Sequence, residues 1–235
     1  MKFLSQVYTA VSGSIGGITY AHNAGGMYSR ARATPTNPNS TRQQIMRMYM
    51  DSAVTYWTET LTEAERESWR VYASNVPLIN KLGQAINVSG QNMFVRSGVP
   101  WLLAGKALSA IATAPTMYDT GDPGTLSLVA ASEATQIAAI GIGGTPAWAG
   151  DADGHLICQA GLPQSPAINF YKGPFRFTAA VPGDATPITT AGVDFSDATP
   201  PIAFVQGQRV FVRVRAQYPD GRLTQAFIFD AVAAA

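Results

Sequence analysis

The stretch GSIGGITYAHNAGGMYSRARATPTNPNSTRQQIMR, residues 13–47, sets the organisation of the N-terminal part of this chain. Within it, Ile18–His22 and Met27–Ala31 are short runs of strand-forming residues on either side of Asn23-Ala-Gly-Gly26. Two such runs around an Asn/Gly turn predict a β-hairpin, because glycine adopts positive φ at little steric cost. Nothing in the stretch has the pattern of an active site, so it points to contact with another protein surface.

The hairpin leads into a proline-containing arm and then into a helix. Pro35 and Pro38 favour extended geometry in the residues that precede them, which predicts a positioned arm over residues 32–39. Asn39 or Ser40 can cap the helix that follows, because a short polar side chain satisfies its free N–H groups. Apolar residues at steps of three and four predict that this helix covers residues 41–58.

Two further helices are expected between Glu63 and about Trp101. The sequence Thr62-Glu-Ala-Glu65 is a capping box, so a second helix begins at Glu63 and ends near Ser74. The short link between the first two helices predicts an antiparallel pair. Ser89 is expected to cap a third helix, which Pro100 kinks or divides.

The sequence pattern changes at about Thr125, where short runs of strand-forming residues begin to alternate with Gly, Pro and Asp. Strands are predicted at residues 126–131, 136–142, 155–160, 175–180, 209–217 and 224–230. The last two strands are joined by a Pro219–Arg222 turn, and Arg213 and Arg215 are expected on a solvated face. Strands at this spacing without helices predict a β-sandwich. Ala233–Ala235 is expected to be a frayed tail.

Charge divides the chain in the same way as the predicted elements. Residues 1–118 contain ten Lys and Arg against five Asp and Glu, and residues 119–235 contain six against ten. The predicted fold class is therefore an α+β N-terminal part over residues 1–118, with a β-hairpin, an extended arm, a helix pair and a third helix. An all-β sandwich follows over residues 119–235, and its run Gly207-Gln-Arg-Val-Phe-Val-Arg-Val-Arg-Ala216 with Asp220-Gly-Arg222 resembles a fibronectin-III or immunoglobulin-like domain. The net charge of +1 implies no polyelectrolyte partner.

Cys158 is the only cysteine, which excludes an intrachain disulfide and fits folding in a reducing cytoplasm. We expect its thiol to pack in the core as a small hydrophobic group. The N-terminus lacks the apolar segment of a signal peptide, and no apolar run approaches membrane-spanning length.

The sequence contains no strong catalytic motif. His22 and His155 are the only histidines, and a surface or interface role is favoured for His22. Asp151-Ala-Asp-Gly-His155 weakly resembles a calcium loop but lacks the later bidentate Glu, so a polar loop between strands is favoured. We therefore expect no enzyme activity, no catalytic residue, no metal and no cofactor.

Arg30, Arg32, Arg42 and Arg47 form a small basic cluster around the arm. Contact with packaged nucleic acid stays open, because arginine pairs well with phosphate. Contact with an acidic protein surface is favoured, because few aromatic residues are interleaved for base stacking. The residues expected to contact a partner are Tyr20, His22, Tyr28, Arg30, Arg32, Pro35, Asn37, Pro38 and Arg42.

The first hundred residues resemble small virion proteins from tailed-phage and prophage genomes. The resemblance rests on the glycine hairpin, the Arg30-x-Arg32 arm, Asn37-Pro38, Thr41-x-x-Gln44 and Val88-Ser-Gly-Gln-Asn-Met-Phe94. It continues through Trp57, Leu61, Arg66 and Trp69. No catalytic residue is carried over from the family.

The resemblance implies a non-enzymatic virion structural protein, made in the cytoplasm of the bacterial host. We expect a head decoration or cement protein whose hairpin and arm bind the capsid lattice. Its partners would be the major capsid protein or other virion subunits, as a homo-oligomer or lattice-bound multimer. No membrane partner is expected, and a nucleic acid partner is disfavoured. Two alternatives stay open. One is a tail, adaptor or baseplate subunit. The other is a host-surface carbohydrate-binding module that uses Trp148, Tyr171 and Tyr218.

Overall fold

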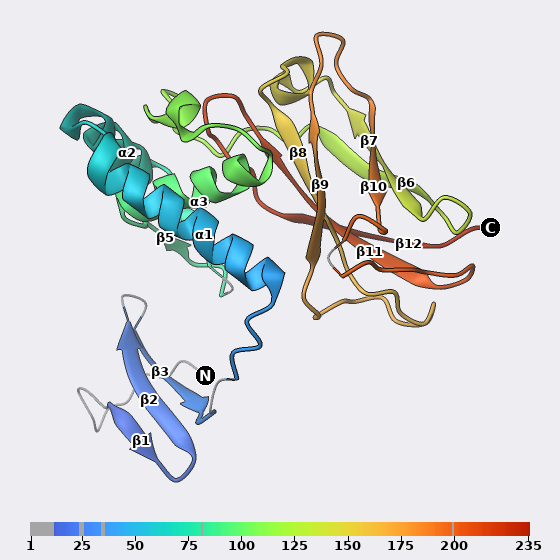
Figure 1. The fold of residues 1–235 in the computed structure, drawn as a ribbon, viewed down its shortest axis with the longest axis horizontal. Coiled ribbons are helices and arrows are strands. Elements are labelled where there is room, and N and C mark those ends of the chain that lie inside the picture. Colours follow the sequence, from blue (N-terminus) through green and yellow to red (C-terminus); the bar gives the residue numbers. More distant parts are fainter. Residues whose placement is uncertain (1–11, 24–25, 34–35, 81, 199) are drawn as a thin grey trace. The chain divides into compact units, whose positions relative to one another are not determined.

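The computed structural model describes residues 12–23, 26–33, 36–80, 82–198 and 200–235. The chain separates into two compact units, Met1–Ser40 and Thr41–Ala235, and each is described by itself. Figure 1 shows the elements of both units in sequence colours.

The first unit contains a three-stranded antiparallel sheet. The predicted hairpin is confirmed by β2 (Ile18–Asn23) and β3 (Gly26–Ala31), which pair from Asn23↔Gly26 to Ile18↔Ala31. A third strand, β1 (Gly13–Ile15), pairs with β2 around a turn at Gly16 and Gly17, both of which have positive φ. The strand order is β1-β2-β3, so β2 is central (Figure 1).

The second unit begins with three helices, which are α1 (Thr41–Thr55), α2 (Glu63–Asn75) and α3 (Gly90–Leu103). A π-helical turn, Tyr56–Thr60, extends the first helix beyond its expected end. The Thr62–Glu65 capping box and the Ser89 cap are both present. Pro100 lies within α3.

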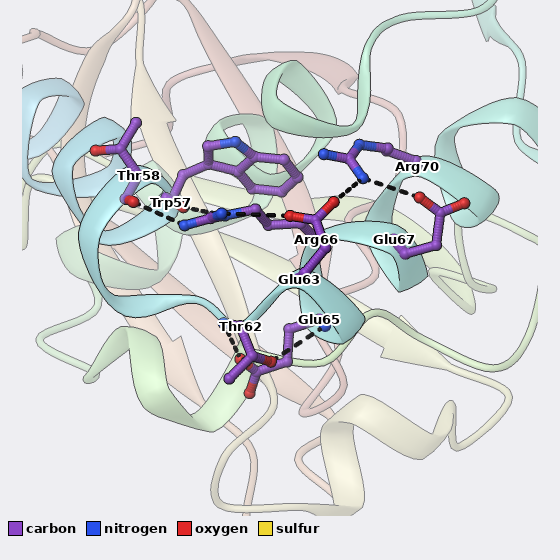
Figure 2. Close-up of polar contacts among 8 residues, drawn as sticks. All are labelled: Trp57, Thr58, Thr62, Glu63, Glu65, Arg66, Glu67 and Arg70. Carbon is purple, nitrogen blue, oxygen red and sulfur yellow. Dashed lines mark hydrogen bonds and ion pairs between the residues drawn. The ribbon is translucent and has the colours of Figure 1, made fainter.

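Arg66 fixes the junction between the first two helices (Figure 2). Its guanidinium donates to the carbonyl oxygens of Trp57 at 2.8 Å and Thr58 at 2.7 Å, near the C-terminal end of the π-helical turn. A cation at this position satisfies carbonyls that have no partner within the helix. Glu63 forms ion pairs with both Arg66 and Arg70, so one network holds the corner.

Aromatic side chains fill the core between the helices. The Trp69 and Phe94 rings meet edge to face with centroids 5.4 Å apart, an arrangement that the ring quadrupoles favour. The indole N–H groups are also satisfied, since Trp69 donates to the Ala112 carbonyl and Trp101 to the Ala107 carbonyl. Short elements complete this part: β4 (Leu78–Ile79), β5 (Ala85–Ile86) and a 3₁₀ turn (Leu108–Ile111).

Two antiparallel sheets form the C-terminal part (Figure 1). One has the order β10-β7-β6, with β6 Thr125–Ser132, β7 Ile137–Gly143 and β10 Thr190–Asp194. The other has the order β12-β11-β8-β9, with β8 His155–Ala160, β9 Arg176–Pro182, β11 Arg209–Gln217 and β12 Phe227–Val232. Side chains from both sheets, including Ile140 and Val214, share one buried cluster with Trp148. The predicted two-sheet sandwich is therefore present.

The six predicted strands all form, but β10 was not predicted. Its sequence Thr190-Ala-Gly-Val-Asp194 has little strand propensity of its own. Pairing with β7 and burial of Ala191 and Val193 supply the missing stabilisation.

Two expectations about exposure were wrong. Arg213 and Arg215 are half-buried, because this face of β11 is partly covered by α3 and by Phe175. The C-terminal residues are not frayed. Ala233 is buried, and the Ala234 N–H donates to the Ala131 carbonyl at 2.8 Å.

The helical part and the sandwich belong to one compact unit but have separate hydrophobic cores. Polar contacts join them: the Gln217 amide donates to the Ser97 carbonyl at 2.8 Å, and Arg222 forms an ion pair with Asp119 at 2.7 Å. The expected domain boundary between residues 118 and 119 stays a prediction.

Gly90 allows α3 to begin directly against α2. A Cβ atom added at Gly90 would lie 2.8 Å from the Arg70 backbone nitrogen, closer than packed atoms approach. At Gly98, on the same helix, an added Cβ would meet a Leu108 methyl group at 3.1 Å and the Ala53 Cβ at 3.7 Å, which is an ordinary contact distance. The two glycines therefore differ in what surrounds them.

We predict that Gly90→Ala lowers the free energy of unfolding by about 1–3 kcal/mol, because the backbones of α2 and α3 must separate. Gly98→Ala is the matched control. It gains the same helix propensity, up to about 1 kcal/mol, and displaces only a flexible side chain. Urea unfolding of both variants would measure the difference, and equal stability of the two would contradict the packing argument.

Candidate assembly interface

The two faces of the β1–β3 sheet differ in character. Residues directly opposite each other in an antiparallel pair project from the same face, and successive residues alternate between faces. The register pairs Ile15 with Ile18 and Ile18 with Ala31, and it also pairs His22 with Met27. We call this side the apolar face; it is formed by Ile15, Ile18, Tyr20, His22, Met27 and Ala31, together with Ser29 opposite Tyr20.

The opposite side, which we call the polar face, contains Ser14, Thr19, Tyr28 and Arg30. These residues are paired by the same register, with Thr19 opposite both Ser14 and Arg30. The Ser14 and Thr19 hydroxyl groups lie 2.8 Å apart and share a hydrogen bond. The polar face can therefore remain in contact with water, as one face of an antiparallel sheet often does.

The apolar face is not matched by a core in the same unit. Ile15 is 78% exposed and Ile18 is 41% exposed. Among the described residues of Met1–Ser40, none is buried. A small sheet gains stability in water from a packed apolar face, and the described residues of this unit do not supply that packing.

The structure divides the predicted contact residues between the two faces. Tyr20 and His22 belong to the apolar face, whereas Tyr28 and Arg30 belong to the polar face, so one flat partner cannot contact all four. Sequence analysis listed these residues but missed Ile15 and Ile18. The alternation of apolar and polar residues in the hairpin could have found them.

The predicted arm has no regular secondary structure in its described part, and Pro35 lies outside the described residues. Arg32, Asn37 and Pro38 are exposed. The Asn39 N–H donates to the Asn37 side-chain oxygen at 3.2 Å, and Asn39 has a φ of 48°. The chain therefore makes a local turn immediately before α1.

Arg42 lies on the body of the second unit. Its guanidinium lies over the Phe177 ring of β9, 5.1 Å from the centroid, and burial lowers its pKa. A cation over an aromatic face is a stabilising contact. Arg42 thus ties the start of α1 to the sandwich.

The groups considered for chemistry lie within the sandwich or its loops. Cys158 is buried as expected, and burial raises the pKa of its thiol to about 12, so the reactive thiolate is disfavoured. Asp151 accepts a hydrogen bond from the Asp153 N–H, and Asp153 forms an ion pair with Lys106. In the described ranges, no three His, Cys, Asp or Glu side chains converge as metal ligands would.

The aromatic residues considered for carbohydrate binding are mostly internal. Trp148 is buried and donates to the Pro123 carbonyl at 3.2 Å, and Tyr218 is buried with its hydroxyl on the Asp122 carbonyl. The Tyr171 hydroxyl bridges Leu162 and Pro174. The carbohydrate-binding alternative needs exposed rings, and the buried Trp148 and Tyr218 rings cannot stack on a sugar.

No helix in the described part of the chain is long and apolar enough to cross a membrane. Comparison with protein-family models finds no match, and comparison with curated proteins finds none either. Among solved structures, the chain is similar to a Fn3-like protein from Clostridium thermocellum, with 13% identity and a TM-score of 0.29. The alignment covers 49% of this chain and 96% of that chain. This distant likeness carries no argument about function, and the sandwich is defined by its own strand order.

His155 is a buried histidine at the contact between the sandwich and α3. Its ring lies 5.2 Å from the Trp101 ring, Nδ1 lies 3.3 Å from the Asp153 carbonyl, and Nε2 has no hydrogen-bond partner in the described part of the chain. Burial lowers its pKa below the ordinary value, because the charged ring would lose its hydration.

We predict that stability falls as the pH drops below about 6.5, because the unfolded chain then binds a proton that folded His155 resists. The loss should continue until the pH reaches the lower pKa of the folded state. Thermal unfolding between about pH 7.5 and 5.5 should show a smaller loss for His155→Gln than for the unchanged chain. Parallel pH curves for the two proteins would contradict this assignment.

Proposed function

We propose that this chain is a non-enzymatic structural subunit of a larger protein assembly. In this proposal, the β1–β3 sheet binds a neighbouring subunit through its apolar face. The observation that carries the proposal is the exposure of Ile15 and Ile18 on a sheet with no buried residue among its described positions. Burying such a face contributes about 25 cal/mol for each Å² of apolar surface removed from water.

The hydrophobic cores of the second unit also support this proposal. Both of its hydrophobic cores are formed by residues 53–233, with no contribution from the described residues of the first unit. The second unit is thus a self-sufficient body. The sheet belongs to the other unit, Met1–Ser40, and its described residues are absent from both cores.

The resemblance of the first hundred residues supports a tailed-phage virion as the setting, with head decoration as the favoured role. The sandwich would be a fibronectin-III or immunoglobulin-like module that stands on the particle surface. The major capsid protein is the proposed partner, and Arg32, which follows the sheet at the start of the arm, would face its acidic groups.

We predict that deleting residues 1–40 leaves the second unit folded but abolishes its binding to particles. The thermal midpoint should be unchanged, because both hydrophobic cores remain intact. Sedimentation with particles that lack the native protein would measure binding. Undiminished binding of the truncated chain would contradict the proposed role of the sheet and arm.

A point variant separates the two faces of the sheet. Ile18→Asp should weaken particle binding by about tenfold or more, because it places a charge in the buried contact. Thr19→Asp is the matched control, since the neighbouring residue on β2 projects from the polar face. Equal weakening by the two variants would argue against docking through the apolar face.

Copy number separates head decoration from the tail alternative. A decoration protein follows the icosahedral lattice, so we predict on the order of hundreds of copies per particle. Quantitative mass spectrometry against the major capsid protein in purified virions would measure it. About six or twelve copies would instead support a tail, adaptor or baseplate subunit.

A further inference from the structure

A second site of interest lies in the second unit, between the helices and the sandwich. A pocket of about 230 Å³ opens there, at the contact of α3 and β11 with the segment that precedes β12. Its walls are formed by Leu78, Ile79, Arg96, Arg215, Gln225 and Ala226. Two guanidinium groups therefore border one small cavity.

Arg96 is held in place by the backbone. Its Nη2 atom donates to the Leu223 carbonyl at 2.7 Å and to the Thr224 carbonyl at 3.4 Å. Burial, together with the charge of Arg215, lowers the Arg96 pKa to about 10. The charged side chain is thus fixed at the pocket although its surroundings disfavour the charge.

Arg215 has an unsatisfied hydrogen-bond donor. Its Nε atom is buried and has no hydrogen-bond partner in the described part of the chain. Burial also lowers its pKa. A buried donor without an acceptor costs about 1–3 kcal/mol, and more when the group is charged.

No carboxylate of this chain compensates the two arginines. All fifteen Asp and Glu residues lie in the described ranges. The cations in the ion pairs among those ranges are Arg66, Arg70, Lys106, Arg209 and Arg222, and neither Arg96 nor Arg215 is among them. Two like charges are therefore held at one pocket without a counterion from the protein.

We propose that this pocket is a binding site for a doubly charged oxyanion of the phosphate or sulfate class. Guanidinium groups bind such oxygens through paired, charge-assisted hydrogen bonds. A dianion matches the two positive charges, whereas one carboxylate would neutralise only one of them.

Calorimetric titration of the full chain with inorganic phosphate, sulfate and acetate tests the proposal. Phosphate and sulfate should bind, and Arg215→Met should weaken that binding by about tenfold or more. Acetate should bind more weakly than either dianion. Absence of phosphate and sulfate binding, or acetate binding as tight as theirs, would overturn the proposal.

Thermal unfolding in chloride and in phosphate at equal ionic strength supplies a second readout. Without phosphate, Arg215→Met should be at least as stable as the unchanged chain, because it retains the aliphatic stem and removes an uncompensated charge. With phosphate, only the unchanged chain should gain stability from site binding. Phosphate also stabilises proteins generally, so the variant measures that background.

Arg213→Met is the matched control. Arg213 lies two residues away on the same face of β11, but its Nε donates to Gln159 and its guanidinium lies over Phe175 at 4.7 Å. It does not line the pocket. This variant should keep the extra stabilisation by phosphate, and equal loss in Arg213→Met and Arg215→Met would contradict a site at Arg215.

Discussion

Burial of an apolar sheet face is the constraint on which the rest of this account depends. Backbone pairing on both sides satisfies the hydrogen-bonding groups of β2, the central strand of the β1–β3 sheet. The apolar face of the sheet has no matching core within the described residues of its unit. Hydrogen bonds alone contribute little net stability, because the unfolded chain makes equivalent bonds to water. The sheet therefore depends on a surface that covers Ile15 and Ile18, and the proposed assembly would provide one.

The second unit has the opposite character. Its helices and its sandwich each bury a complete hydrophobic cluster, and buried polar contacts join the two. Gln217 on β11 and Ser97 on α3 lie more than a hundred residues apart in sequence, so their hydrogen bond fixes distant segments together. A rigid body of this kind can carry a docking element without changing its own fold.

Local chemistry allowed much of this fold to be predicted from the sequence. The Thr62–Glu65 capping box, the glycine turns of the hairpin and the alternation in Arg209–Gln217 each depend on neighbours in the chain. Features that depend on tertiary packing were missed. Strand β10 forms by pairing with β7, and Arg215 is half-buried because distant segments partly cover β11.

The candidate interface was also predictable only in part. Its position in residues 13–40 was evident from the turn residues, but which side chains share a face depends on the register of three strands. Sequence analysis grouped Arg42 with the basic residues around the arm, and only the fold places it over Phe177. Arg96 and Arg215 lie 119 residues apart in sequence, so no local sequence pattern predicts that they line the same pocket.

Amide hydrogen exchange over residues 13–31, in the free protein and in the assembled particle, tests the central claim most directly. The account predicts fast exchange in the free protein, because an uncovered small sheet opens readily, and strong protection after assembly. Slow exchange in the free protein that assembly leaves unchanged would contradict it.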